Sequence, residues 1–232
     1  MDTLNIFCDA SILKSSHLNE TVGCPGFIAT TYMPYYGRQD IIDEKTDILR
    51  HSTNNESEIT AILMGVQKAV SVKDQFETIN LFSDSRICIQ SLRNWIFNWV
   101  NNRDENGMMY GSNHNYVSNQ QIISRVVHTI AMNNLKINLW HQKGHVALSS
   151  KSSLENARVL FEKENHVTGV TEDFIKKISI FNDMIDKDTK YRLARDVATL
   201  TMIEKPQLIY PMRYTLGELT MKNYAQLINV EK

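Results

Sequence analysis

The chain has 232 residues, a formal charge of −1, and 42% hydrophobic and 22% charged residues. These ordinary globular values exclude wholesale disorder and predict a packed core. A charge near zero also excludes a surface that holds nucleic acid by overall charge alone, so any such binding must depend on a local groove or on metal ions. Because the sequence shows no leader pattern and no apolar run of the ~18 residues that a membrane span needs, we expect a cytoplasmic protein with no membrane partner.

Apolar and alternating patterns predict three strands and then a helix in the first third of the chain. The strands are expected at 4–8, 27–33 and 40–49, and Pro34 and Gly37 mark the turn between the last two. From Glu56 onward apolar residues recur at helical spacing, and Asn54 and Asn55 stand before them as capping residues. Three consecutive strands of this kind indicate an antiparallel meander.

The rest of the chain alternates helices with two more short strands. The strands are expected at 78–82 and 136–140. Helices are expected at 87–99, 118–132 and 152–161, and after residue 165 at 172–185 and 191–202, followed by an ambiguous tail with Pro206 and Pro211. This order predicts an α/β domain at 1–165, with a five-stranded mixed sheet flanked by helices, and a mostly helical C-terminal extension of unassigned role at 166–232.

Three acidic residues stand where regular elements begin or end. Asp9 follows the first strand, Glu58 lies in the first turn of the first helix, and Asp84 follows the fourth strand. Each alone is more simply explained as a turn former or as a complement to the helix dipole. If the first and fourth strands are neighbours, however, the two aspartates lie side by side, and such carboxylates repel one another unless cations neutralise them. Hard oxygen ligands of this kind suit Mg²⁺ or Mn²⁺, so the sequence predicts a metal site.

These residues and their surroundings resemble the type-one ribonuclease H family. The similar segments are 6–11 (IFCDAS), 52–58 (STNNESE), 82–85 (FSDS), 94–99 (NWIFNW) and 140–145 (WHQKGH). They follow the family's order over roughly residues 3–163, and five linked motifs are far more specific than one short pattern. The resemblance implies an RNase H-like fold and an endoribonuclease that cleaves the RNA strand of RNA–DNA hybrids by two-metal-ion hydrolysis, with two Mg²⁺ ions that Mn²⁺ can replace.

The resemblance also implies roles for individual residues. Asp9, Glu58 and Asp84 become metal ligands, and Glu58 would also contact a ribose 2′-hydroxyl, the group that distinguishes RNA from DNA. His145, on a loop after the last strand, would assist proton transfer or product release, a task that suits a side chain titrating near neutrality. The implied substrate contacts are Asn54, Asn55, Ser85, Arg86, Gln90 and Trp95. For Asn55 a capping role, and for Trp95 a place in the core, remain as alternatives.

The fourth metal ligand is where the sequence departs from the family. Family members place an Asn, and four residues later an Asp, on the helix after the histidine. Ungapped spacing from His145 puts Glu155 at the acid position, whereas Asn156 in the asparagine position puts Leu160 there and leaves one metal short of a ligand. We expect Glu155 as catalytic residue and metal ligand, because that register turns an apolar set inward, namely Leu154, Ala157 and Phe161.

A second departure concerns the loop at 101–116, where bacterial relatives often carry a lysine-rich handle for substrate. Here Arg103 is its only Lys or Arg. The missing family aspartate allows a competing hypothesis, a nucleic-acid-binding or assembly module that kept the fold and lost turnover. A metal nuclease acting on DNA is a third possibility, against which the 2′-hydroxyl contacts of Asn54, Asn55 and Glu58 argue.

Overall fold

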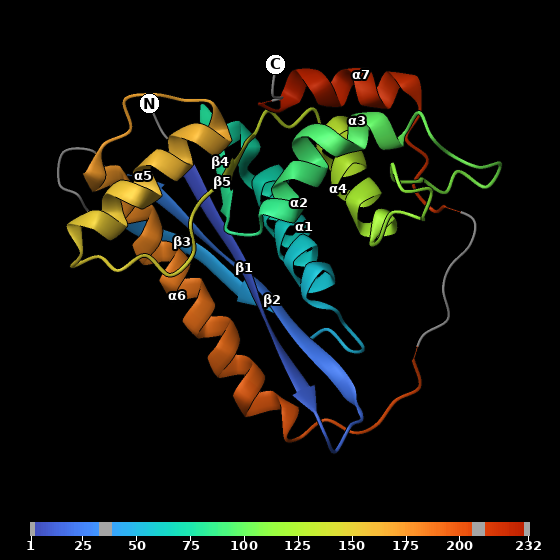
Figure 1. Cartoon of the computed structure of the whole chain (residues 1–232), viewed down its shortest axis with the longest axis horizontal. Helices are drawn as coiled ribbons and strands as arrows, with labels where there is room; N and C mark the ends of the chain where they lie inside the picture. Colours follow the sequence, from blue (N-terminus) through green and yellow to red (C-terminus); the bar gives the residue numbers. More distant parts are fainter. Residues whose placement is uncertain (1–2, 33–38, 206–211, 230–232) are drawn as a thin grey trace.

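A twisted five-stranded sheet forms the centre of the computed structural model, which describes residues 3–32, 39–205 and 212–229 (Figure 1). The strand order is β3-β2-β1-β4-β5. The strands are β1 (Thr3–Ser15), β2 (Glu20–Tyr32), β3 (Gln39–Thr46), β4 (Thr78–Ser83) and β5 (Asn138–His141). Because β1 pairs antiparallel with β2 and parallel with β4, the sheet is mixed, as predicted.

The register of β1, β4 and β5 aligns the ends of β4 and β5 with the middle of β1. In β1 and β4, Cys8 lies opposite Ser83, and in β4 and β5, Ser83 lies opposite His141. Asp9 and Asp84 follow directly on these positions, so the two carboxylates emerge next to each other. The loop after β5, which carries His145, starts at the same level of the sheet.

Helices cover both faces of the sheet. One face is packed by α1 (Asn54–Val72), α4 (Gln120–Met132) and α7 (Glu218–Leu227), and the other by α5 (Lys151–Asn165) and α6 (Glu172–Val197) (Figure 1). A short 3₁₀ turn, Lys73–Gln75, follows α1. After β4 the chain runs through α2 (Arg86–Gln90), a π-helical segment (Ser91–Trp95) and α3 (Ile96–Trp99). The strand pleat divides β1 between the two cores, with Leu4, Ile6 and Cys8 on the first face and Phe7 on the second.

Residues beyond 165 pack against the sheet and its helices. The sequence predicts two helices in 172–202, but α6 is one continuous helix that lies across β1 and β2. Its inner face buries Ile175, Ile178, Phe181 and Ile185 in the core of Phe7 and Phe82. The α7 helix was not predicted, and its buried Tyr224 donates a hydrogen bond to the Leu92 carbonyl at 3.0 Å. The extension is helical as predicted, and it covers sheet surface that would otherwise meet water.

Several local predictions differ from the structure. β1 and β2 form a hairpin that extends well beyond the predicted strands, because Ile12–Lys14 pair with β2 although their side chains are exposed. The cap of α1 is Thr53, which makes a reciprocal capping box with Glu56, and not Asn54 or Asn55. The predicted strand end at Met33, the turn at Pro34 and Gly37, and the prolines of the tail, Pro206 and Pro211, lie outside the described residues. Within the described part of the chain, no helix is both long and apolar enough to cross a membrane.

Candidate active site

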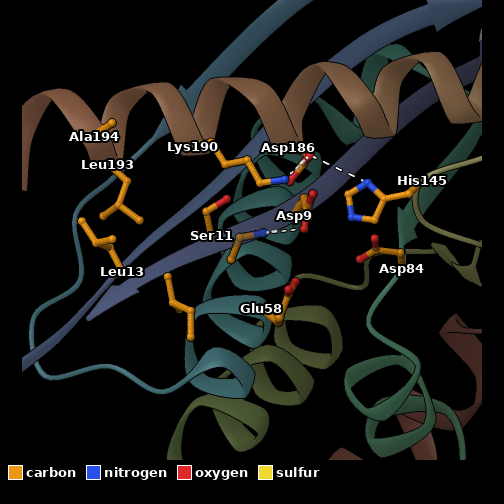
Figure 2. A pocket seen from close by; sticks show the side chains of 12 residues that line it. Asp9, Ser11, Leu13, Glu58, Asp84, His145, Asp186, Lys190, Leu193 and Ala194 are labelled. Atoms are coloured by element: carbon orange, nitrogen blue, oxygen red, sulfur yellow. Dashed lines mark hydrogen bonds and ion pairs between the residues drawn. The ribbon is translucent and has the colours of Figure 1, made fainter. Parts of the chain in front are cut away.

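Three acidic side chains meet at the edge of the sheet. Asp9 from β1, Glu58 from the first turns of α1 and Asp84 from the end of β4 each offer an oxygen, and these oxygens lie within 4.8 Å of one another (Figure 2). The Ala10 amide donates a 2.7 Å hydrogen bond to Asp9 Oδ1, which fixes that carboxyl group. The three residues line one cavity of about 380 Å³. The structure thus brings together the three acids that the sequence singled out.

The proximity of these acids changes their titration. Burial, followed by the charge of Asp84, raises the pKa of Asp9 to about 8. Burial and the charges of Asp9 and Asp84 raise the pKa of Glu58 to about 9. Burial also raises the pKa of Asp84, against the effect of a hydrogen bond from Asn182. Without a cation, the site therefore favours protonated carboxyl groups at neutral pH.

The donor set fits a hard divalent cation. Glu58 Oε2 is buried and has no hydrogen-bond partner among the described residues, so these residues leave one oxygen of the cluster unsatisfied. Leaving such an atom unpaired costs free energy that a bound cation would recover. Oxygen ligands only, clustered and partly dry, are typical of Mg²⁺ or Mn²⁺ sites. Asp9, Glu58 and Asp84 can hold such an ion.

A fourth carboxylate reaches the cavity from α6. Asp186 lines it together with the other three acids, and its charge contributes to the raised pKa of each of them. The Lys190 ammonium, one turn later, lies 2.7 Å from Asp186 Oδ2 (Figure 2). α6 therefore both covers the sheet and supplies an acid to the site.

Buried amides connect α6 to the end of β4. Gln142 Nε2 donates to Asn182 Oδ1 at 2.7 Å, and Asn182 Nδ2 lies 3.4 Å from Asp84 Oδ2. Both amide side chains are almost fully buried, at 1% exposure each. Since Asn182 stands one helical turn before Asp186, the same stretch of α6 orients one carboxylate and provides another.

The loop after β5 closes against Asp84. A side chain at Gly144 would place its Cβ 2.2 Å from Asp84 Oδ2, so only glycine allows this approach. His145 follows with a left-handed backbone (φ 52) and a side chain that is 71% exposed. Its Nδ1 lies 4.0 Å from Asp186 Oδ2, so the imidazole stands at the rim of the cavity, as Figure 2 shows.

The structure does not bring Glu155 to the carboxylates. The predicted inner face of α5 is confirmed, since Leu154, Ala157 and Phe161 are buried. Glu155 nevertheless points to solvent, with its Oε1 2.6 Å from Arg158 Nη2, and it does not line the cavity. The reason is that α5 packs against the edge strand β5 and against α6, whereas α6 packs across β1 and passes the site.

None of the predicted substrate residues, all of which the structure describes, lines the carboxylate cavity. Asn54 and Asn55 are exposed in the first turn of α1, which also carries Glu58. Ser85 and Arg86 follow Asp84 directly, and the Arg86 Nε donates to Glu164 at 2.9 Å. Further along the same helical run, Gln90 accepts a hydrogen bond from Asn94, and Trp95 is 39% exposed beside Trp99. A core position for Trp95 is thereby wrong.

Comparison with known proteins identifies the family. The RNase H family model matches residues 1–159, and the chain belongs to this family. A search of curated protein sequences found no match.

Two solved structures illustrate the similarity of the fold. The PFV RNase H domain is 18% identical, with a TM-score of 0.51 over 69% of this chain and 90% of that domain. A foamy viral protease-reverse transcriptase in complex with RNA/DNA hybrid is 14% identical, with a TM-score of 0.50 over 69% of this chain and 20% of that protein. The chain thus corresponds to about a fifth of the length of that viral protein, and identities this low bear on the fold alone.

The family's acid pattern occurs at a place that the sequence analysis missed. Asn182 and Asp186 stand four residues apart on one helix, which is the spacing expected after the histidine. The prediction fell on Glu155 because α5 intervenes between His145 and α6. An Asn-x-x-x-Asp pair at the end of the helix predicted at 172–185 was the available signal.

Proposed function

We propose that this protein is a divalent-cation-dependent endoribonuclease that cleaves the RNA strand of RNA–DNA hybrids. The observation that carries the proposal is the convergence of Asp9, Glu58, Asp84 and Asp186 on one cavity. Membership of the RNase H family supports the same reading. We include Asp186, rather than Glu155, as the fourth carboxylate.

The four carboxylates would hold two divalent cations, with Mg²⁺ as the expected ion and Mn²⁺ as a substitute. Bound there, such ions supply the positive charge that activates water and stabilises the leaving oxygen in phosphodiester hydrolysis. Asp9 is held by its own backbone, and Asp84 is oriented by Asn182, so the ligands need little rearrangement. Glu58, next to the exposed Asn54 and Asn55, is placed to meet a ribose 2′-hydroxyl in the minor groove.

His145 is proposed to handle a proton at the rim. Its side chain is exposed, close to Asp186, and carried by a loop that Gly144 holds against Asp84. An imidazole at the rim of the site suits transfer of a proton to the departing oxygen, or release of the product. The hydrogen bond from Gln142 to Asn182 holds the loop and α6 in a fixed relative position.

The alternative of a binding module without turnover depended on the absence of a fourth acid. Asp186 removes that premise. Assembling four repelling carboxylates is costly, and a module that only binds nucleic acid has no use for them. The enzyme hypothesis is therefore preferred.

A substrate panel tests the proposal. The protein would be incubated with an end-labelled RNA–DNA hybrid, double-stranded RNA or double-stranded DNA, each with Mg²⁺, with Mn²⁺ and with EDTA. We expect cuts in the RNA strand of the hybrid only, with either cation and not with EDTA. Equal cleavage of double-stranded DNA, or cleavage that survives EDTA, would refute it.

A further inference from the structure

Two further hollows adjoin the carboxylate cavity on the side of the β1–β2 hairpin. The cavity reaches Leu13 and Ala194, and both residues also line a second hollow of about 390 Å³. That hollow shares Lys14, Ser15 and Ser16 with a third, of about 400 Å³, which extends to the residues before α1. Since each hollow shares its lining with the next, the two form one depression continuous with the site, which we call the hairpin groove. Figure 2 shows its beginning at Leu13 and Ala194, opposite His145.

The groove is long enough for a nucleic-acid strand. From Asp9 to Ser16 the floor follows seven steps of β1, or about 23 Å at ~3.3 Å per residue. Successive phosphates of a duplex strand are at least about 3.4 Å apart, so this length spans several nucleotides. The wall on one side is the last part of α6, and on the other the segment before α1.

The free charge of the groove is positive. Lys14 and Lys205 are exposed, and neither ammonium has a hydrogen-bond or ion-pair partner among the described residues. Glu20 is the one acid among the described residues that line the two hollows. Its buried carboxylate accepts hydrogen bonds from Arg50 Nε at 2.5 Å and from the His51 amide at 2.9 Å, so its charge is already neutralised. What remains is a pair of lysines directed at solvent.

The floor between the carboxylates and these lysines is apolar. Ile12 and Leu13 are 43% and 42% exposed, so they present apolar surface beside the carboxylates. In the loop at 101–116, Arg103 is the only Lys or Arg, and its Nη1 donates to the Leu216 carbonyl at 2.9 Å. Lys14 and Lys205 therefore supply positive charge on the hairpin side of the site, in addition to Lys143 on the loop after β5.

Taking hydrolysis of hybrids as the premise, we propose that the hairpin groove binds the RNA strand on one side of the cleaved bond. Lys14 and Lys205 contact backbone phosphates, and Ile12 and Leu13 contact the sugars. Because the groove begins at the carboxylates, the strand that enters it is the strand that is cut. The groove replaces the missing basic handle as the part of the protein that holds substrate.

Equilibrium binding without divalent cations tests this inference, because nothing is then cleaved. Hybrid affinity would be measured against salt concentration for the full chain, for K14Q/K205Q, and for the matched control K151Q/K222Q, whose lysines are also exposed but lie on α5 and α7. Removing one lysine–phosphate interaction lowers the slope of log affinity against log salt by about 0.7–0.9. We expect K14Q/K205Q to lower the slope by roughly 1.4–1.8 and the affinity by about 10- to 60-fold at 0.1 M salt. The control should match the wild type.

Neutral methylphosphonate linkages identify the strand. Placed along the RNA strand, they should weaken wild-type binding and have little further effect on K14Q/K205Q, whereas in the DNA strand their effect should add to that of the variant. At saturating hybrid, the single-turnover cleavage rate of K14Q/K205Q should stay within about twofold of the wild-type rate. An unchanged salt slope, or coupling to the DNA strand, would overturn the groove assignment. A wild-type protein that cuts no hybrid would instead refute the proposed function on which it rests.

Discussion

Replacing Asp9 by asparagine should stabilise the cation-free protein, and by an amount that depends on pH. The pKa of Asp9 is raised from 3.8 to about 8, so between these values the folded chain keeps a proton that the unfolded chain has released. Stability therefore falls as pH rises from about 4 to about 8. At about 1.4 kcal/mol per pH unit, this loss reaches roughly 4 kcal/mol at pH 7, and asparagine avoids it.

Thermal unfolding in EDTA from pH 4 to pH 9 measures this effect. The melting temperatures of D9N and wild type should agree near pH 4 and separate by roughly 8–16 °C at pH 7, since 1 kcal/mol corresponds to about 2–4 °C in a chain of this size. Adding Mg²⁺ should raise the melting temperature of the wild type and remove much of its difference from that of D9N. D74N, which changes an exposed aspartate in the 3₁₀ turn after α1, is the control and should show no pH-dependent difference. A D9N protein that is less stable than wild type at pH 8, or a gap independent of pH, would refute the reasoning.

Three further predictions concern the site and the extension. D186N should lower the cleavage rate at least ~10- to 100-fold, whereas the rate of E155Q should stay close to that of the wild type. A large loss of rate in E155Q and none in D186N would instead identify Glu155 as the ligand. H145A should slow turnover by about 10- to 100-fold with little change in hybrid affinity, and an equal loss of both would make His145 a substrate contact. A 1–168 fragment should aggregate, because it lacks α6 and exposes the sheet surface that four large apolar residues of that helix cover. Burial of those four side chains contributes roughly 6–12 kcal/mol, which is comparable to the total stability of a domain, about 5–15 kcal/mol. A monomeric, cooperatively melting fragment would instead support a domain boundary near 165.

The features that were predictable from the sequence are those with a local cause. Glu58 lies at the start of α1 and Asp84 directly after β4, and the pairing of β1 with β4 brings Asp9, which lies within β1, beside Asp84. The helices with a regular apolar face, such as α1 and α4, were predicted for the same reason. Gly144 was also recognisable within its motif, although its close approach to Asp84 is visible only in three dimensions.

The features that were missed depend on tertiary contacts. α6 was predicted as two helices because polar residues interrupt its apolar face after Ile185. One of them, Thr189, is fully buried and its hydroxyl lies 2.9 Å from that of Ser11, so a hydrogen bond across the core maintains the helix where apolar periodicity lapses. The fourth carboxylate was predicted on the wrong helix because the sequence does not reveal that α5 does not line the site. Asp186 becomes a candidate only once α6 is known to cross β1.

The most direct test of the central claim is an anomalous-difference map from crystals soaked in Mn²⁺. The proposed function requires that the cations bind between Asp9, Glu58, Asp84 and Asp186. We expect anomalous peaks bounded by these four carboxylates and none beside Glu155. A protein that cleaves hybrid in Mn²⁺ but shows its peaks elsewhere, or shows none in this cavity, would contradict the assignment of the site.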